Sequence, residues 1–215
     1  MNVTKYPQSC VIVEKEANQL LFDPGFFARQ KYLADTFHDI SAIILTHRHG
    51  DHVDEGFIKE ILNLNQVPVI ANEDVKEILG DVVTKVVNDG DVFEIAGFKI
   101  EALFLPHVKM VDDQVPPPNI GFIIDDKLLV PGDSIEIAPR NIPYVLLPIA
   151  GPDLSLRDAR VFCEKINAQI AIPVHYSIFS DEKPEVAVSL ISSALPSTRL
   201  YVLENQETVN LPDLI

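Results

Sequence analysis

The sequence predicts an α/β protein in which β-sheets pack face to face and helices lie outside them. Pairs of short apolar segments flank tight turns, as in β-hairpins, and several continuous apolar runs have the length of buried strands. A few segments with helical spacing lie between these runs. Because each sheet must bury its apolar face, this mixture favours stacked sheets with helices on the outer faces.

The first part of the chain begins with a predicted hairpin. An apolar strand over 9–14 precedes a polar turn at 16–18, and a second strand over 19–22 ends at Asp23-Pro24-Gly25. A fully buried strand is expected over 40–46. The elements that follow are expected to alternate, with helices over 55–63 and 74–79 and strands over 66–71 and 82–87.

Strong turn signals separate the elements of the second part. The turn at 88–91 precedes two expected strands, and Asp125-Asp126 joins a second hairpin. Two helices are expected, one over 155–166 with Asp158 placed to cap its first turn, and one over 184–194. The expected strands are 92–95, 99–105, 120–124, 127–130, 144–148, 170–174 and 199–203.

The composition is that of an ordinary soluble globular protein. Its 215 residues are 47% hydrophobic, which suits one domain over residues 1–215 with a sizeable core. No apolar run has the length of a membrane span, and the first residues lack the apolar stretch of a signal peptide. Cys10 and Cys163 lie far apart in apolar segments, which favours buried free thiols in a reducing cytoplasm.

The net charge of −15 makes some classes of binding partner less favourable than others. It disfavours nucleic acid and anionic membrane surfaces, and the sequence has no basic cluster to offset it. A small-molecule substrate is therefore expected, and an anionic one is not excluded because bound cations would dominate the local charge. The sequence leaves the oligomeric state open.

The densest chemical signal is a histidine cluster directly after the expected strand over 40–46. It is His47-Arg48-His49-Gly50-Asp51-His52, with three of the six histidines of the chain. Neutral imidazole is the commonest metal ligand, and carboxylate completes a site for a divalent ion. Adjacent Asp51 and His52 diverge by about 100° if they open a helix, so these donors suit two ions better than one.

More donors must come from elsewhere, because a metal needs three or four protein ligands. His107, Asp133 and His175 each follow an apolar segment. Strand ends along one rim of a sheet bring together ligands that are distant in sequence, and a carboxylate at Asp133 could bridge two cations. His38 lies outside this pattern and is expected at the surface.

The donor pattern resembles the metallo-β-lactamase superfamily. The match consists of His47-x-His49-x-Asp51-His52, then His107, the Gly-Asp-Ser segment at Asp133, and His175. Two further segments, 146–151 and Pro173-Val174-His175-Tyr176, resemble the branch of small metal-dependent hydrolases that includes the ascorbate-6-phosphate lactonases. That branch usually has a Gly-His-Ser-like segment in its first hairpin, where this chain has Pro7-Gln8-Ser9.

The resemblance implies an αββα four-layer sandwich, with two mixed β-sheets, helices outside, and the site at one edge. It assigns a first metal to His47, His49 and His107. It assigns a second metal to Asp51, His52 and His175, with Asp133 bridging. Zinc is favoured over iron, because flavodiiron relatives have Glu at the position of His49, and manganese is the other candidate.

The resemblance also implies a reaction. A hydroxide bridging two divalent ions would attack a small ester, lactone or related substrate, since two cations lower the pKa of bound water toward ~7. Asp51 would orient this nucleophile, which makes it the expected catalytic residue. Asp23 is a candidate hydrogen-bond partner for a ligating histidine.

Two other functions stay open at this point. A phosphodiesterase or nuclease of the same superfamily would use the same ions, although the charge disfavours nucleic acid. A non-catalytic metal-binding regulatory protein would keep the ligands without turnover. The irregular segment 108–119 is expected either to wall the substrate pocket or to form a rigid surface loop.

Overall fold

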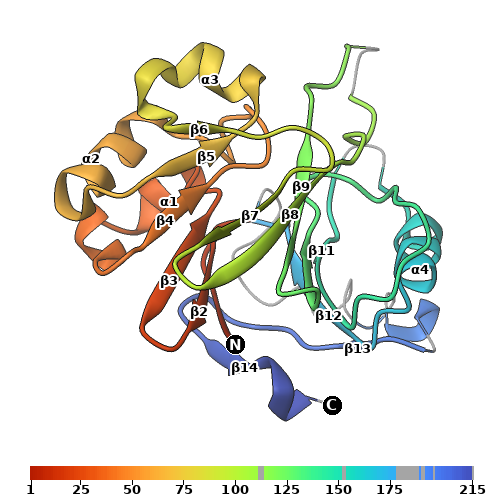
Figure 1. Cartoon of the computed structure of the whole chain (residues 1–215). Coiled ribbons are helices and arrows are strands. Elements are labelled where there is room, and N and C mark those ends of the chain that lie inside the picture. Colours follow the sequence, from red (N-terminus) through yellow and green to blue (C-terminus); the bar gives the residue numbers. More distant parts are fainter. Residues whose placement is uncertain (111–113, 152–153, 178–188, 190–191, 196, 215) are drawn as a thin grey trace.

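A computed structural model describes residues 1–110, 114–151, 154–177, 189, 192–195 and 197–214. Its described part contains two seven-stranded sheets stacked on each other (Figure 1). Both are mixed, because each contains parallel and antiparallel pairs. The expected α/β architecture of two mixed sheets with helices outside is confirmed.

The first sheet has the strand order β14-β1-β2-β3-β4-β5-β6. Its strands are β1 (Asn2–Lys5), β2 (Val11–Lys15), β3 (Asn18–Phe22), β4 (Ala42–Ile44), β5 (Val69–Ala71), β6 (Lys85–Val86) and β14 (Thr208–Asn210). The second sheet has the order β13-β12-β11-β10-β9-β8-β7. Its strands are β7 (Val92–Ile95), β8 (Phe98–Phe104), β9 (Ile120–Ile124), β10 (Leu128–Val130), β11 (Tyr144–Pro148), β12 (Ile170–Val174) and β13 (Arg199–Leu200).

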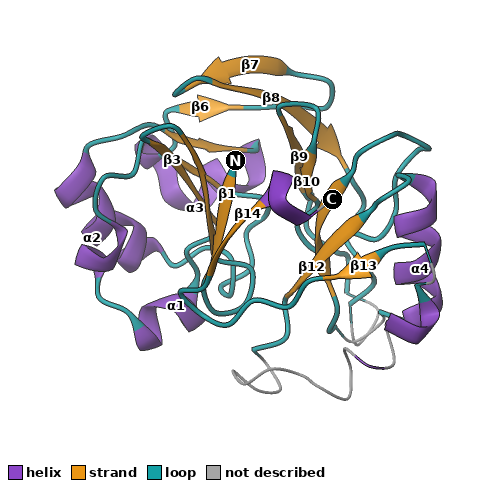
Figure 2. Ribbon diagram, turned by 90° about the horizontal axis from the view of Figure 1, so that it is seen from below, coloured by secondary structure: helices purple, strands orange, loops and turns teal. Residues whose placement is uncertain are grey.

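Helices cover the outer faces of the sheets, as Figures 1 and 2 show from two directions. On the side of the first sheet lie α1 (Phe26–Lys31), α2 (Glu55–Asn65) and α3 (Glu73–Leu79), and on the side of the second lies α4 (Leu156–Lys165). Short 3₁₀ turns are η1 (Ala34–Phe37), η2 (Gly80–Val82) and η4 (Leu211–Leu214). None of the described helices is long and apolar enough to cross a membrane.

Three apolar clusters follow from this layering. The central one fills the space between the sheets and includes Phe22 and Phe122, whose ring centroids are 6.2 Å apart. The second joins α2 to the first sheet through fully buried Phe57 and Ile61. The third joins α4 to the second sheet through Phe162. Each sheet thus buries both faces, which explains why its inner strands are continuous apolar runs.

Strand direction decides where the functional edge lies. β3 to β6 are parallel to one another, and so are β10 to β13. β8 is antiparallel to β9, which is antiparallel to β10, so β8 runs in the same direction as β10. The carboxyl ends of β4, β8, β10 and β12, each followed by a predicted ligand segment, can therefore lie at one end of the sandwich.

Most predicted elements are present, and the differences have local causes. The strand expected over 40–46 is shorter because the Thr46 amide donates to the side chain of Asp23 rather than to a neighbouring strand. Helix α4 begins after Ser155, whose hydroxyl accepts from the Asp158 amide and donates to the Asp158 carboxylate, so Asp158 takes part in the N-terminal cap as expected. The helix expected over 184–194 lies largely outside the described residues. Cys10 and Cys163 are free and buried, as expected.

Two strands and one α-helix were not expected from the sequence. Strands β1 and β14 pair with each other at one edge of the first sheet, with Val3 opposite Val209. Each is only three or four residues long, so neither gives a clear alternating pattern. Helix α1 is short and has no side-chain cap at Gly25, so the usual start signal is missing.

Candidate metal centre

The chain brings the seven predicted donor residues together at one end of the sandwich. They form two groups in which one candidate ligand atom of each residue lies within 4.8 Å of the others. The groups are His47, His49, His107 and Asp133, and Asp51, His52, Asp133 and His175. These are the two sets that the resemblance implied, and Asp133 belongs to both.

The first group is built from three imidazole rings that point at one another. His47 Nε2 lies 3.0 Å from His49 Nδ1, and His107 Nε2 lies 3.2 Å from the same atom. The Asp133 carboxylate approaches this group through Oδ2, which is 3.6 Å from His107 Nε2. Ring nitrogens that converge in this way share one point that a cation can occupy.

The second group surrounds Asp133 from the other side. His175 Nε2 lies 2.9 Å from Asp133 Oδ2 and 3.1 Å from Asp51 Oδ2. His52 Nε2 lies 3.2 Å from Asp133 Oδ1. Both atoms of this last pair are buried without a hydrogen-bond partner among the described residues. Unsatisfied buried polar atoms are rare in folded proteins, and a bound cation would satisfy both.

The donor set also fits a metal through its outer hydrogen bonds. His107 Nδ1 donates to the carbonyl of Val108 at 2.6 Å, and His175 Nδ1 donates to the carbonyl of Ala150 at 2.7 Å. Because carbonyls can only accept, these bonds place a proton on Nδ1 and direct Nε2 toward the site. Metal-binding histidines are usually fixed in this way.

Asp23 plays the same part for His52, in the position expected of it. Its fully buried carboxylate accepts from His52 Nδ1, from the Thr46 amide and from the Thr46 hydroxyl, each at 2.8 Å. The Thr46 oxygen in turn lies 3.1 Å from His47 Nδ1. Thr46 therefore links both groups to one carboxylate. Sequence reasoning missed Thr46, although its place directly before the cluster was a usable signal.

The turn that carries Asp23 must also lie close to the cluster. A Cβ on Gly25 would come within 2.0 Å of the Asp51 carbonyl oxygen. Only glycine leaves room for this approach. The Asp-Pro-Gly segment is thus both the end of β3 and a support for the donor loop.

Asn119 is a second support that sequence reasoning missed. It is fully buried, and its side-chain amide donates to the carbonyls of Leu105 and Pro131 at 3.0 and 2.9 Å. Its Oδ1 accepts from the Asp133 amide at 3.3 Å. One side chain thereby joins the segments that lead to His107 and Asp133. Nothing in the local sequence distinguishes it from an ordinary loop asparagine.

The two donor groups differ in the direction in which the pKa values of their histidines are shifted. Burial lowers the pKa of His47 well below its ordinary value, and the neighbouring His52 lowers it further. Burial and His107 also lower the pKa of His49. These rings are neutral at physiological pH and present lone pairs to a cation, as metal binding requires.

In the second group, carboxylates reverse the effect of burial. Burial opposes the charged form of His52, but Asp133, Asp51 and Asp23 raise its pKa well above the ordinary range. The pKa of His175 rises to about 10 for the same reason, because Asp133 outweighs burial. Burial alone would raise the pKa of Asp51 and Asp133, but the facing histidines hold both well below the usual carboxyl value.

A cavity of about 170 Å³ opens over the donors. Five of the donors line it, and its other walls are Val108, Met110, Pro148, Ala150, Gly151 and Leu154. No lysine or arginine is among these lining residues. The described residues of segment 108–119 are irregular, and Val108 and Met110 among them wall the cavity, which was one of the two expected roles.

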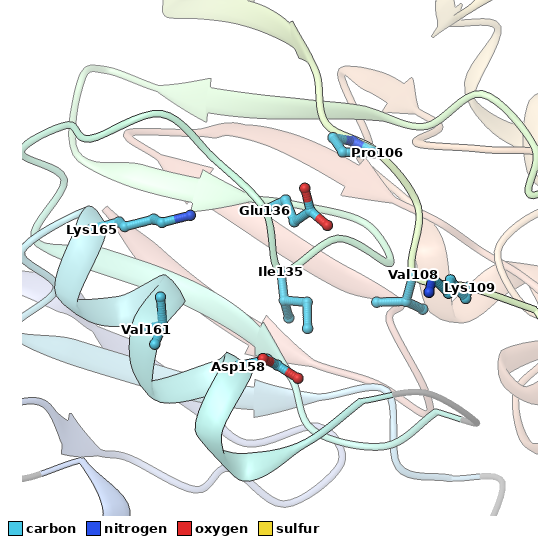
Figure 3. Close-up of a pocket in the computed structure, with 8 residues that line it drawn as sticks. All are labelled: Pro106, Val108, Lys109, Ile135, Glu136, Asp158, Val161 and Lys165. Carbon is cyan, nitrogen blue, oxygen red and sulfur yellow. The ribbon is translucent and has the colours of Figure 1, made fainter.

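A second cavity of about 420 Å³ also has Val108 in its wall (Figure 3). It lies between α4, the segment after β8 and the segment after β10, and none of the seven donors lines it. Its walls carry Lys109 and Lys165 as well as Glu136 and Asp158, so it is more polar than the first cavity. Val108 borders both cavities.

The remaining residues of the histidine segment have other positions. Arg48 points away from the donors and pairs with Asp74 at 2.9 Å on the surface. His38 is exposed, as expected, and its Nδ1 contacts the carbonyl of Asp35.

Two stacked mixed sheets, outer helices and a histidine-carboxylate centre at one edge define the class of proteins with the metallo-β-lactamase fold. A family model described as a beta-lactamase superfamily domain matches residues 2–175. The chain belongs to the metallo-β-lactamase superfamily, and the resemblance seen in the sequence is confirmed at this level. The narrower likeness to ascorbate-6-phosphate lactonases stays a prediction.

The chain aligns over most of its length with relatives of known sequence and structure. The UPF0173 metal-dependent hydrolase YtkL of Bacillus subtilis is 27% identical over 241 aligned positions, covering 98% of this chain and 100% of the relative. A UPF0173 metal-dependent hydrolase of Methanocaldococcus jannaschii is 29% identical and covers 82% and 85%. A putative metal-dependent hydrolase from Parabacteroides distasonis has a similar structure, with a TM-score of 0.76, 23% identity, and coverage of 95% and 93%.

Proposed function

We propose that the protein is a dinuclear metal-dependent hydrolase that cleaves a small ester, lactone or related carbonyl substrate. The observation that carries this proposal is the pair of four-residue donor groups that share Asp133. Relatives named as metal-dependent hydrolases support the reaction class. Zinc is the metal that the histidine-rich donor set favours, with manganese as the alternative.

Each donor has a defined task in this proposal. His47, His49 and His107 would hold one ion, Asp51, His52 and His175 the other, and Asp133 both. Two ions held there supply an activated water near neutral pH and stabilise negative charge that develops on the substrate. Asp51 borders the cavity and would also orient the attacking water, which makes it the catalytic residue of the chain. Asp23 would keep the His52 imidazole in the tautomer that exposes Nε2.

The cavity favours a carbonyl over a phosphoryl substrate. Its walls beyond the donors are mostly apolar, and none of the described residues that line it is a lysine or arginine that could hold phosphate oxygens. At about 170 Å³ it is smaller than the roughly 300–1,000 Å³ of ordinary ligand pockets, so it suits a small reacting group. The net charge of −15 also disfavours a nucleic-acid substrate.

Metal analysis and a matched substrate panel test the proposal. The zinc-loaded protein is expected to hold two ions per chain and to hydrolyse p-nitrophenyl acetate or a thiolactone faster than bis(p-nitrophenyl) phosphate. Asp51→Ala should reduce this hydrolysis by at least about 100-fold. Preference for the phosphodiester would favour the phosphodiesterase alternative. Full metal loading without turnover on the panel would favour a regulatory metal-binding protein.

A further inference from the structure

Gln8 is a buried polar side chain that contacts the second donor group directly. It lies in the turn between β1 and β2, with a relative exposure of 1%. Its amide Nε2 donates to Asp51 Oδ2 at 2.8 Å, and its Oε1 accepts from the Ser177 amide at 3.0 Å. Because a backbone N–H can only donate, the amide oxygen must face Ser177. The NH₂ group must then face Asp51.

The backbone of Gln8 forms hydrogen bonds with the same segment, at His175 and Ser177. Its carbonyl accepts from the His175 amide at 3.0 Å, and its own amide donates to the Ser177 hydroxyl at 2.7 Å. Both Gln8 and His175 have φ of 62°, in the left-handed region that non-glycine residues seldom adopt. Such conformations persist where the surrounding bonds fix them, and these four hydrogen bonds supply that restraint.

The hydrogen bonds of Gln8 to the donors involve the second donor group. They include two residues of the second donor group, Asp51 and His175, and within the described part of the chain Gln8 makes no hydrogen bond to His47, His49 or His107. We propose that Gln8 is a positioning residue that fixes the Asp51 carboxylate and the His175 backbone, and thereby sets the metal affinity of the second position without affecting the first. This inference rests on the proposed dinuclear site.

The chemistry of the amide suits this task. Asp51 Oδ2 also lies 3.1 Å from His175 Nε2 and 3.8 Å from His52 Nε2, so it is the oxygen that faces the second position. A neutral N–H donor holds that oxygen in place while the carboxylate keeps its full charge for the cation. Without this bond the side chain of Asp51, which is partly exposed at 22%, can rotate toward the cavity.

Stepwise metal titration of the apo protein tests the proposal. Cobalt is added to the chelated protein, and the two binding steps are followed by visible absorption and by competition with a chromophoric chelator. Gln8→Leu keeps the volume but removes the donor and the acceptor. Gln8→Asn keeps an amide that favours the left-handed backbone but is too short to reach both partners. Gln19→Leu is the matched control, because Gln19 is a half-buried glutamine that bonds Glu14 far from the donors.

Both Gln8 variants are expected to weaken the second step by about 10- to 100-fold and to leave the first step within about twofold of wild type. Gln19→Leu should change neither step. Equal weakening of both steps would overturn the proposal, since a general structural role would not separate them. An unchanged second step would overturn it as well. Wild-type protein that binds two ions but hydrolyses nothing would refute the proposed function and leave the role of Gln8 standing.

Discussion

Asp23 and His52 form a fully buried carboxylate–imidazole pair, with His52 Nδ1 2.8 Å from Asp23 Oδ2. The two residues lie 29 positions apart and meet because β3 and β4 are parallel neighbours. The pair orients Nε2 of His52 toward Asp133. It therefore connects the turn after the first hairpin to the proposed second metal position.

Asp23→Asn should weaken metal binding at that position. Asp23 accepts three hydrogen bonds with its two oxygens, and Asn has one oxygen to replace them. We expect about a 10- to 100-fold loss of affinity in the second step and about 1–3 kcal/mol less stability toward urea. Asp39→Asn is the control, because Asp39 also faces a histidine, His38, but both are exposed. Equal effects of the two substitutions would contradict the assigned role of Asp23.

Gly132→Ala should displace Asp133. Gly132 has φ of 61°, and a Cβ there would come within 2.1 Å of Asn119 Oδ1, the atom that accepts from the Asp133 amide. We expect a loss of roughly 2–4 kcal/mol in the free energy of unfolding, together with weaker binding of both ions. Gly90→Ala separates the two causes, because Gly90 has φ of 81° but no atom near its Cβ position. It should lose only about 1–2 kcal/mol and bind metal normally.

The sequence predicted the seven candidate donor residues better than the residues that hold them in position. His47, His49, Asp51 and His52 form a local pattern, and His107, Asp133 and His175 follow apolar segments that proved to be strands at one edge. Thr46 and Asn119 act only through contacts made after folding. Their residue types are common in loops, and only the place of Thr46 directly before the histidine cluster was a usable signal.

The fold was predictable for a related reason. Buried parallel strands such as β12, in which all five residues are buried, give continuous apolar runs that can be recognised in the sequence. The edge strand β14 and its neighbour β1 depend on pairing between the two ends of the chain, where Val3 meets Val209. Such a contact leaves no local pattern. Pairing of this kind is fixed by the whole sheet and not by either segment.

The stability of the metal-free protein should fall as the pH rises from 7 to 9. The pKa of His175 is raised from its ordinary 6.5 to about 10, since Asp133 and Asp51 outweigh burial. A raised folded-state pKa gives stability that is complete below about 6.5 and is lost as the pH rises through about 10. We expect His175 to contribute a slope of about −1 kcal/mol per pH unit in urea unfolding of the chelated protein.

His52 contributes to the slope in the same window, because its pKa is also raised well above its ordinary 6.5, whereas the contributions of Cys10 and Tyr6 begin only near their ordinary values of 9.0 and 10.0. His175→Gln should reduce the slope by the contribution of His175. Loading with zinc should reverse its sign, since metal binding requires the deprotonated imidazole. Stability that rises with pH in the chelated wild type would show that the carboxylates do not hold a proton on His175.

The position of Val108 in the walls of both cavities leads us to expect that its side chain limits the size of the substrate. The cavity over the donors has a volume of about 170 Å³, and the neighbouring one about 420 Å³, with Val108 bordering both. Val108→Ala should open a path between them while leaving the backbone bonds of residue 108 to His107 and Asp133 intact. On p-nitrophenyl esters of increasing acyl length, kcat/KM should rise several-fold for hexanoate or octanoate and stay unchanged for acetate. Val161→Ala, which enlarges only the second cavity, should leave the whole series unchanged, and an equal change for all chain lengths would mean that Val108 does not limit substrate size.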